Sequence, residues 1–253
     1  MTTASTTSLV KEASKSSHLV HEAVIERIFE HKADTRSLFL RLPVEQTVKF
    51  RPGQFLSFLL PIAGQTVTRA YSITSDPENG NLLEICFNVV HDGIGSHYLC
   101  ERQAGNILRF TGPWGTFVLE HPPQTECVFI ADGVGIAPMR PMIKRALALN
   151  IGRSVRLLYS ALNEECLLYR SELQLLEQRY AQFSFTPLLS IPSGQWDGLA
   201  GASLETVERQ YVQADGNRDR HFYICGVGDQ VTALRDLLRQ SGYQRRAVQY
   251  EKW

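Results

Sequence analysis

The sequence predicts two domains, an N-terminal antiparallel β-barrel and a C-terminal α/β domain with a parallel sheet. The chain has 253 residues, enough for one large domain or two of ordinary size. Near residue 121 the hydrophobic pattern changes, from short alternating runs to strand-like runs that alternate with helical ones. The expected division is a disordered tail over residues 1–19, a barrel over 20–121 and an α/β domain over 122–253.

The first half contains short apolar or β-branched runs that are each bounded by Pro, Gly, Asn or Asp. This pattern is typical of short strands joined by turns in a small barrel or sandwich. The expected strands lie over residues 21–29, 37–43, 54–60, 66–73, 82–90 and 106–112, with one short helix over 95–102.

In the second half, strand-like and helical runs alternate after the His-Pro-Pro-Gln stretch at 121–124. This alternation predicts βαβ units, whose parallel sheet binds ligands beyond the carboxyl ends of its strands. The expected strands are 126–132, 154–161, 183–190 and 220–226, and the expected helices are 138–149, 169–180, 203–212 and 230–240.

Charge and cysteine content exclude several classes of partner. The 26 Lys and Arg residues balance 26 Asp and Glu residues, so we expect no binding to nucleic acid or to a membrane. No apolar run approaches the ~20 residues that cross a bilayer, and the N-terminus lacks the core of a secretory signal. An organelle transit peptide remains an alternative for this Ser-rich end. The five cysteines are scattered, which predicts no metal site and favours a cytoplasmic protein with reduced thiols.

The stretch "DGVGIAPM" (132–139) joins the first strand of the second half to a helix. Gly133 and Gly135 let the backbone approach a diphosphate, which the free N–H groups of the helix start would bind. Pro138 and Pro141 suit the first helical turn, where a missing N–H has no intrahelical partner. Any tight strand-to-helix turn also uses glycines, so this stretch alone does not decide between a nucleotide site and a plain turn.

The stretch "RAYS" (69–72) adds a second candidate site in the barrel. Arg69 and Tyr71 share one face of a strand, and Ser72 begins the turn that follows. A guanidinium, an aromatic plane and a hydroxyl can hold a phosphate, stack on a flat ring and hydrogen-bond its edge. Gly93, Gly95 and Ser96 of "GIGSHYL" then offer another phosphate-binding turn. Together these stretches suggest two nucleotides that meet at the domain junction.

Six motifs in this order resemble those of the ferredoxin-NADP reductase superfamily of flavin reductases, over about residues 20–253 and without a fused ferredoxin domain. They are "RAYS" (69–72), "GIGSHYL" (93–99), "GPWG" (112–115), "DGVGIAPM" (132–139), "LLYRSEL" (167–173) and "YICG" (223–226). The resemblance implies that the barrel binds FAD and that the second domain binds NADH or NADPH.

For the flavin, the resemblance implies that Arg69 pairs with the phosphates, Tyr71 packs against the isoalloxazine and Ser72 hydrogen-bonds near N5. It also implies that Gly95 and Ser96 cradle the pyrophosphate, which favours FAD over FMN. The full set of implied flavin-binding residues is Arg69, Ala70, Tyr71, Ser72, Asn88, Val89, Val90, Gly93, Gly95 and Ser96.

For the pyridine nucleotide, the resemblance implies transfer of a hydride from nicotinamide C4 to flavin N5, which requires the two atoms about 3–3.5 Å apart. The implied binding residues are Gly133, Val134, Gly135, Pro138, Cys225, Gly226 and Gly228, and the residues nearest the chemistry are Ser72, Cys225, Glu251 and Trp253. Cys225 can also be a buried small apolar residue. Trp253 is either a lid over the flavin or an aromatic residue docked in the sheet.

Asp132 departs from the family pattern, which has a small residue at this position. Its carboxylate either accepts hydrogen bonds from the amides of the turn or weakens nucleotide binding by repulsion. Leu162 and Ile191 stand where NADPH-specific relatives often have arginines, so NADH is favoured over NADPH. Arg170 is a cation that could substitute for them.

The favoured function is electron transfer from NAD(P)H through FAD to a separate one-electron carrier, such as a ferredoxin, a flavodoxin or the iron–sulfur component of an oxygenase. The alternatives are direct reduction of a free flavin, a quinone or a ferric chelate, and a non-catalytic flavoprotein subunit. An acidic carrier protein would be attracted by a basic group made up of Lys49, Arg51, Arg235, Arg239, Arg245 and Arg246.

Overall fold

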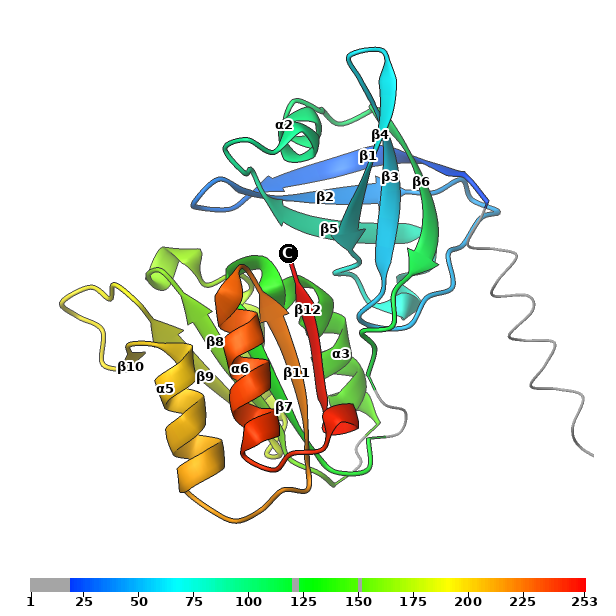
Figure 1. Ribbon diagram of the computed structural model, residues 1–253. Helices are drawn as coiled ribbons and strands as arrows, with labels where there is room; N and C mark the ends of the chain where they lie inside the picture. The colour runs from blue at the N-terminus through cyan, green and yellow to red at the C-terminus, as the bar shows by residue number, and fades with distance from the viewer. Residues whose placement is uncertain (1–18, 120–122, 150–151) are drawn as a thin grey trace, which may run out of the picture. The chain divides into compact units, whose positions relative to one another are not determined.

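The computed structural model describes residues 19–119, 123–149 and 152–253 (Figure 1). The chain forms two compact units: the first ends at Thr116, the second begins at Phe117, and the short segment His31–Ala33 is grouped with the second. The predicted boundary at 121/122 falls within residues 120–122, which lie outside the described residues, and it stays a prediction. The predicted tail over 1–19 lies outside them too, apart from Leu19.

The first unit is a six-stranded antiparallel sheet with the strand order β4-β3-β6-β1-β2-β5 (Figure 1). A bridge between Ile73 and Ile85 links the two ends of this order, so the sheet curls into a barrel. The predicted short helix is present as α2 (Ile94–Cys100). The strands are β1 (His21–Glu30), β2 (Thr35–Arg41), β3 (Phe55–Ile62), β4 (Gln65–Ser72), β5 (Leu82–Asn88) and β6 (Ile107–Trp114).

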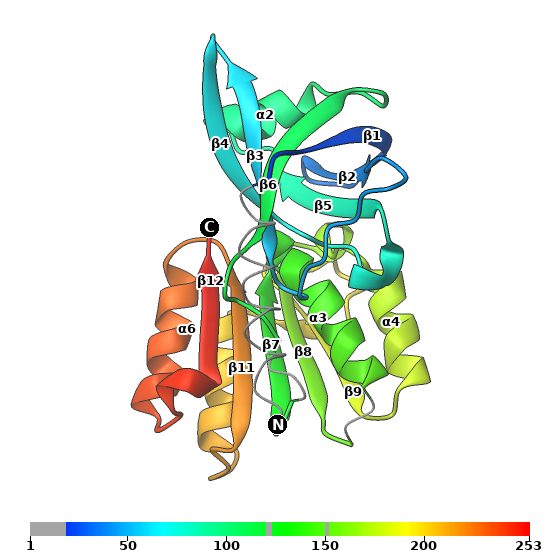
Figure 2. The ribbon, with the colours of Figure 1, turned by 90° about the vertical axis from the view of Figure 1, so that its right-hand side faces the viewer.

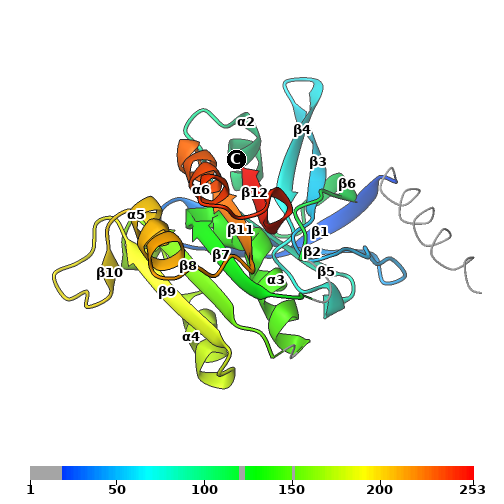
Figure 3. The ribbon, with the colours of Figure 1, turned by 60° about the horizontal axis from the view of Figure 1, so that its bottom comes forward.

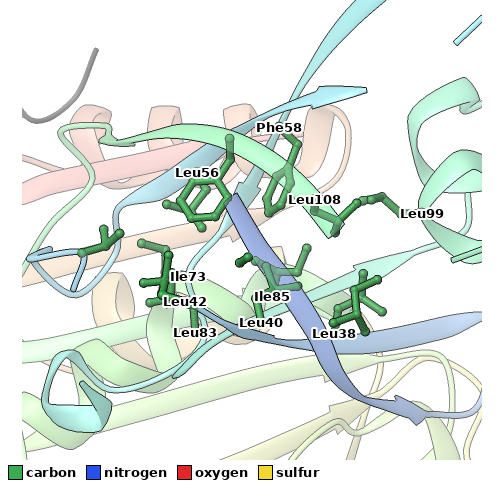
Figure 4. Close-up of a cluster of buried hydrophobic side chains, with 14 of the residues drawn as sticks. Leu38, Leu40, Leu42, Leu56, Phe58, Ile73, Leu83, Ile85, Leu99 and Leu108 are labelled. Carbon is green, nitrogen blue, oxygen red and sulfur yellow. The ribbon is translucent and has the colours of Figure 1, made fainter. Parts of the chain in front are cut away.

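Alternation along the strands builds the barrel core. In the first half of β1, buried and exposed side chains alternate, because successive residues of a strand point to opposite faces. Figure 4 shows the resulting cluster, to which most of the barrel strands and α2 contribute. Its labelled members are Leu38, Leu40, Leu42, Leu56, Phe58, Ile73, Leu83, Ile85, Leu99 and Leu108, all at most 2% exposed.

The second unit is a six-stranded parallel sheet with the order β10-β9-β8-β7-β11-β12. Helices α3 and α4 lie on one face and α5 and α6 on the other (Figures 2 and 3). The strands are β7 (Glu126–Asp132), β8 (Val155–Ala161), β9 (Phe183–Leu189), β10 (Leu199–Ala200), β11 (Arg220–Gly226) and β12 (Val248–Lys252). The helices are α3 (Ile136–Ala148), α4 (Arg170–Arg179), α5 (Ser203–Val207) and α6 (Asp229–Gln240). None of the described helices is long and apolar enough to cross a membrane.

This strand order determines where a ligand binds. From β7 the chain moves outward to β8, β9 and β10, and then returns to place β11 on the other side of β7. Such a reversal leaves a crevice beyond the carboxyl ends of the two strands that flank it, and ligands of open α/β sheets bind there. The crevice of this sheet therefore lies at the ends of β7 and β11, where Asp132 and Cys225 stand.

The start of α3 differs from its prediction. A short 3-10 turn, Gly133–Gly135, leads directly into α3 at Ile136, two residues before the predicted start. Pro138 is therefore the third helical residue, whereas Pro141 lies inside the helix and not in its first turn. The prediction for Pro141 was wrong because the glycine turn already has helical curvature and extends the helix backwards.

Two further differences concern the last hundred residues. The predicted helix over 203–212 is α-helical only to Val207 and continues as a π-helix over Glu208–Gln213. There the carbonyl of Tyr211 accepts a hydrogen bond from the Tyr243 hydroxyl, 2.7 Å away, which lies outside the helix. In addition, β10 and β12 were not among the predicted strands. β12 forms because its backbone pairs in parallel with β11, from Phe222↔Val248 to Gly226↔Lys252.

Candidate functional site

In the barrel, the candidate site starts where α2 packs on β4. A Cβ added at Gly95 would lie 2.6 Å from Cγ of Arg69 and 3.3 Å from Oη of Tyr71. Gly95 thus touches both side chains, and they share one face of β4, as their alternation predicted. A side chain at position 95 would fill this space, so glycine keeps the backbone at the start of α2 close to the aliphatic part of Arg69 and to the phenol of Tyr71.

Tyr71 and Ser72 are the last two residues of β4, and their hydroxyl groups have different surroundings. The Tyr71 ring meets Phe58 and Phe87 edge-on, with centroids 5.8 and 5.3 Å away, and burial raises its pKa to about 12. The phenol is therefore neutral at physiological pH. Ser72 is 2% exposed, and its hydroxyl has no hydrogen-bond partner within the described part of the chain. A buried polar group without a partner is costly, so a ligand that hydrogen-bonds Ser72 fits this site.

The loop between β5 and α2 is shaped by Ser96. Its Oγ donates to the Gly93 carbonyl at 2.9 Å and accepts from the Val90 amide at 3.0 Å. The predicted phosphate contact of Ser96 can therefore involve its backbone N–H, because the hydroxyl already holds the loop together. Asn88 ends β5, and the amide of Val89 donates to the Asp34 carbonyl at 2.8 Å.

In the second unit, Gly135 brings the strand-to-helix turn against the end of β11. A Cβ added at Gly135 would lie 2.1 Å from the Cys225 carbonyl oxygen and 3.0 Å from the Gly226 nitrogen. Only glycine permits this approach of two backbone segments. The contact places Gly135 beside Cys225 and Gly226, and the binding of one nucleotide by these residues together with Gly133 and Val134 stays a prediction. Pro138 follows one turn into α3, and Gly228 precedes α6.

Cys225 and Trp253 form a direct contact at the end of this sheet. The indole Nε1 of Trp253 donates to the Cys225 Sγ at 3.2 Å, and the backbone amide of Trp253 donates to the Gly226 carbonyl at 3.2 Å. Glu251 is the register partner of Cys225 on β12. Burial, and next the negative charge of Glu251, raise the pKa of the Cys225 thiol. The thiol, on a residue that is 1% exposed, is therefore protonated at physiological pH.

Asp132 is held by the neighbouring strand and not by the turn. Its Oδ1 accepts from the Ser160 Oγ at 2.8 Å, and no side-chain hydrogen bond caps the turn that follows it. The hypothesis that the turn amides satisfy this carboxylate was therefore wrong. The turn begins with Gly133 at φ +52°. Ser160, at the end of β8, was not noticed in the sequence, because only the pairing of β7 with β8 brings it to Asp132.

Leu162 and Ile191 follow β8 and β9 as an exposed apolar pair, linked by a hydrogen bond of 2.7 Å from the Ile191 amide to the Leu162 carbonyl. Beside them stands Glu164, whose carboxylate accepts from the Ser193 amide at 3.1 Å and from the Ser193 hydroxyl. These hydrogen bonds lower the pKa of Glu164, so it is ionised at physiological pH. The sequence pattern drew attention to Leu162 and Ile191 but not to Glu164, since only the turn of the 3-10 helix Glu164–Cys166 places it near Ser193.

Arg170, the cation expected as a possible substitute, begins α4 and lies over the ring of Trp196, with its Cζ 5.4 Å from the ring centroid. The indole Nε1 of Trp196 donates to the Leu199 carbonyl at 3.0 Å, which fixes the ring. A guanidinium and an aromatic plane thus stand together at the start of α4.

Two family models match the chain in order. The oxidoreductase FAD-binding domain matches residues 22–119, and the oxidoreductase NAD-binding domain matches residues 129–235. The protein is therefore an oxidoreductase with an FAD-binding and a pyridine-nucleotide-binding domain. Ferredoxin--NADP reductase B of Sorangium cellulosum is 31% identical over 208 residues, which are 81% of this chain and 85% of that protein. The chain belongs to the ferredoxin-NADP reductase superfamily.

Other relatives are reductase components of oxygenase systems. The ferredoxin reductase component of 3-ketosteroid-9-alpha-monooxygenase of Mycolicibacterium smegmatis is 30% identical and aligns with 89% of this chain. The phenol hydroxylase P5 protein of Acinetobacter pittii is 28% identical over 85% of this chain. The chain spans 63% and 60% of the length of these two relatives.

Solved structures share the fold. A cytochrome P450 reductase from Amycolatopsis superposes with a TM-score of 0.82 at 23% identity, covering 93% of this chain and 70% of that one. A ferredoxin NADP⁺ reductase from Neisseria gonorrhoeae, solved with FAD and NADP, has a TM-score of 0.79 at 22% identity and covers 92% and 98%. The predicted fold class, the two cofactors and the class of flavoprotein reductase are confirmed.

Proposed function

We propose that this reductase takes electrons from NADH and passes them through FAD to a separate one-electron carrier, namely a ferredoxin, a flavodoxin or the iron–sulfur component of an oxygenase. The observation that supports this most is the pair of sites, one for each nucleotide, in a chain whose relatives are named as ferredoxin reductases and oxygenase reductase components. FAD supplies the chemistry, because it accepts two electrons at once and releases them singly.

In the barrel, we assign the ring and phosphates of FAD to the residues on and beside β4. The guanidinium of Arg69 binds the phosphates together with the loop amides of Gly95 and Ser96. Tyr71 presents its ring to the flavin, and Ser72 gives its buried hydroxyl to the ring edge near N5. Ala70, Asn88, Val89, Val90 and Gly93 contribute backbone contacts to the same cofactor.

In the second unit, we assign the diphosphate of the nucleotide to the turn Gly133–Gly135 and the start of α3, where backbone N–H groups have no intrahelical partner. The nicotinamide ring lies beside Cys225, in the place where the indole of Trp253 now donates to the thiol. Trp253 therefore has to move when the ring enters. Glu251 and the protonated thiol of Cys225 orient the ring, and Gly226 and Gly228 keep the approach open.

The preference for NADH is supported by the residues that surround Leu162 at one end of the crevice. A 2′-phosphate placed there meets two apolar side chains and the ionised Glu164, and repulsion by that carboxylate disfavours NADPH. A free ribose 2′-hydroxyl, in contrast, can donate to the same carboxylate. Arg170 is a cation and attracts phosphate. Its guanidinium lies over the Trp196 ring, however, and there we expect it to stack with the adenine, which NADH and NADPH share.

Replacing Ile191 by arginine is expected to raise kcat/KM for NADPH relative to NADH by about tenfold, because a charge-assisted hydrogen bond contributes about 1.5 kcal/mol. Steady-state rates with both nucleotides measure the ratio. Val44→Arg is the matched control, since Val44 is also exposed but lies in the first unit. If Ile191→Arg leaves the ratio at the wild-type value, the 2′-position does not lie near Ile191.

The carrier is proposed to be acidic because arginines gather at the end of α6 and before β12. Arg245 and Arg246 are exposed, and Arg239 lies over the Tyr250 ring, with its Cζ 5.6 Å from the ring centroid. Arg235 also pairs with Asp236 at 2.8 Å, which offsets its charge. Lys49 and Arg51 add cationic charge in the first unit.

The scattered free cysteines support a cytoplasmic location, where thiols stay reduced.

The experiment that tests this function is a titration of the purified, FAD-loaded protein without oxygen, once with NADH and once with NADPH. We expect NADH to bleach the visible flavin band at lower concentrations than NADPH. The reduced protein should then reduce an added iron–sulfur carrier, at a rate that falls with salt if the carrier is acidic. A flavin band that neither nucleotide bleaches contradicts the proposal. Equally fast turnover with a quinone or a ferric chelate alone would point to a small acceptor instead.

A further inference from the structure

Asp132 places a carboxylate at the end of β7, next to the proposed nucleotide site. Its Oδ1 is held by Ser160, which is 5% exposed, while its Oδ2 makes no hydrogen bond with any residue that the structure describes. Because Ser160 holds one carboxylate oxygen, the carboxylate has a fixed position. Its other oxygen can interact with a ligand that binds beside it. The carboxylate stands where β7 ends, and the neighbouring strand β11 ends at Gly226.

The position of Asp132 relative to the nicotinamide site follows from its backbone contacts. A Cβ added at Gly226 would lie 2.8 Å from the Asp132 Cβ, so these two strand ends touch. On the other side of β11, Glu251 is the register partner of Cys225. The negative charges of Glu251 and Asp132 both contribute to the raised pKa of the Cys225 thiol. The end of β11 therefore lies between two strands that each have a carboxylate residue at or next to their last position, with Asp132 of β7 beside Gly226 and Glu251 of β12 beside Cys225. The cation next to Glu251 in the chain, Lys252, is neutralised by Asp229 at 2.9 Å.

The two forms of the nucleotide differ in charge only at the ring, because the oxidised nicotinamide is a cation and the reduced one is neutral. The diphosphate is the same in both. A fixed carboxylate near the ring consequently stabilises NAD⁺ relative to NADH, whereas a carboxylate near the diphosphate disfavours both forms equally. The ratio of the two affinities separates these effects.

We propose that Asp132, acting with Glu251, makes the crevice select the oxidised nucleotide over the reduced one. This rests on the proposed function, since it takes the nicotinamide ring to lie beside Cys225. By linkage, tighter binding of NAD⁺ makes bound NADH a stronger donor. As NADH becomes NAD⁺, one hydride carrying two electrons leaves C4 of the ring and FAD receives it, with no further reactant. Asp132 is thus a specificity-determining residue that favours electron flow from the nucleotide to the flavin.

The test compares Asp132→Asn with the wild type, both loaded with FAD. Asparagine keeps the shape and can still accept from Ser160, but it removes the charge. NAD⁺ is titrated into the oxidised protein and NADH into protein reduced beforehand, so that neither mixture can react. ADP-ribose, which has the diphosphate but no nicotinamide, is the third probe. The dissociation constants are measured by calorimetry.

We expect Asp132→Asn to weaken NAD⁺ about fivefold and to leave NADH and ADP-ribose within about twofold of the wild type. For a two-electron couple a fivefold change in the ratio corresponds to about 20 mV. Glu205→Gln, which removes an exposed carboxylate of α5, should keep the wild-type ratio.

Two results would overturn this inference. An equal shift of all three probes would assign Asp132 to the diphosphate, and no shift of any probe would remove it from the crevice altogether. Failure of the proposed function would look different, because the wild-type protein itself would then bind none of the three probes.

Discussion

Gly135→Ala is expected to lower the free energy of unfolding of the second unit by about 3 kcal/mol and to slow flavin reduction by NADH about 100-fold. The added Cβ would lie 2.1 Å from the Cys225 carbonyl oxygen and 2.6 Å from its carbon. Both are backbone atoms of a central strand, so the clash is relieved only by moving β11 away from the glycine turn. That movement displaces Cys225 and Gly226, the residues assigned to the nicotinamide.

The backbone conformation of Gly135 leaves the steric clash as the only expected cause of these losses. Its φ of −56° is accessible to any residue. Alanine would therefore stabilise the protein at this position if no neighbouring atoms blocked the added Cβ. Gly216→Ala is the control, because nothing lies within 4 Å of the atom that it adds. Thermal unfolding and stopped-flow reduction measure the two effects, and the flavin band should persist, since the FAD residues belong to the first unit. Wild-type behaviour of Gly135→Ala would show that β11 and the turn are not held in contact.

Arg220→Met is expected to destabilise the second unit by about 3 kcal/mol. The Arg220 side chain is 8% exposed and donates to Glu126 at 2.7 Å, to Asp215 at 2.6 Å and to the Tyr243 hydroxyl at 3.1 Å. Removing the guanidinium leaves Glu126, 14% exposed, with Arg156 as its one ionic partner among the described residues. We therefore expect the low end of the range known for broken buried pairs. Chemical denaturation, followed by circular dichroism, measures the loss.

Arg235→Met is the matched control for Arg220→Met. Arg235 is also paired with an aspartate, but this pair is on the surface of α6, and such pairs contribute about 0–1 kcal/mol. If the loss comes from the missing second partner of Glu126, adding Glu126→Gln to Arg220→Met should recover part of the stability. Equal effects of the two arginine variants would contradict the assignment of Arg220 to a buried network.

The same network predicts a dependence on acid. Hydrogen bonding to Arg220 lowers the pKa of Asp215 from 3.8 to about 2. A carboxyl whose pKa is lower in the folded state contributes stability that is fully present above its unfolded pKa. That contribution disappears as the pH falls from about 4 to about 2. Arg220→Met should therefore lose less stability than the wild type over this interval.

The sequence predicted the fold well because its two halves have different periodicities. The alternation in β1 and the continuous apolar run in β7 each reflect how many faces of the strand are buried, which is a local property. β12 was harder, since Val248–Lys252 has mixed exposure and becomes a strand through its pairing with β11. The π-helical end of the predicted helix over 203–212 likewise depends on Tyr243, which lies 32 residues away from Tyr211.

For the candidate site, the sequence by itself determined which residue types are available: glycines at two turns that we propose bind phosphate, Arg69 and Tyr71 on one strand face, and a Cys-Gly turn at 225–226. Spacing within a strand or turn fixes such local arrangements. Only the tertiary structure decided which distant side chains meet. The partner of Asp132 is Ser160, the partner of Cys225 is Trp253, and Ser193 anchors Glu164. These contacts join residues 28 or 29 positions apart, and they exist because parallel strands bring their carboxyl ends together.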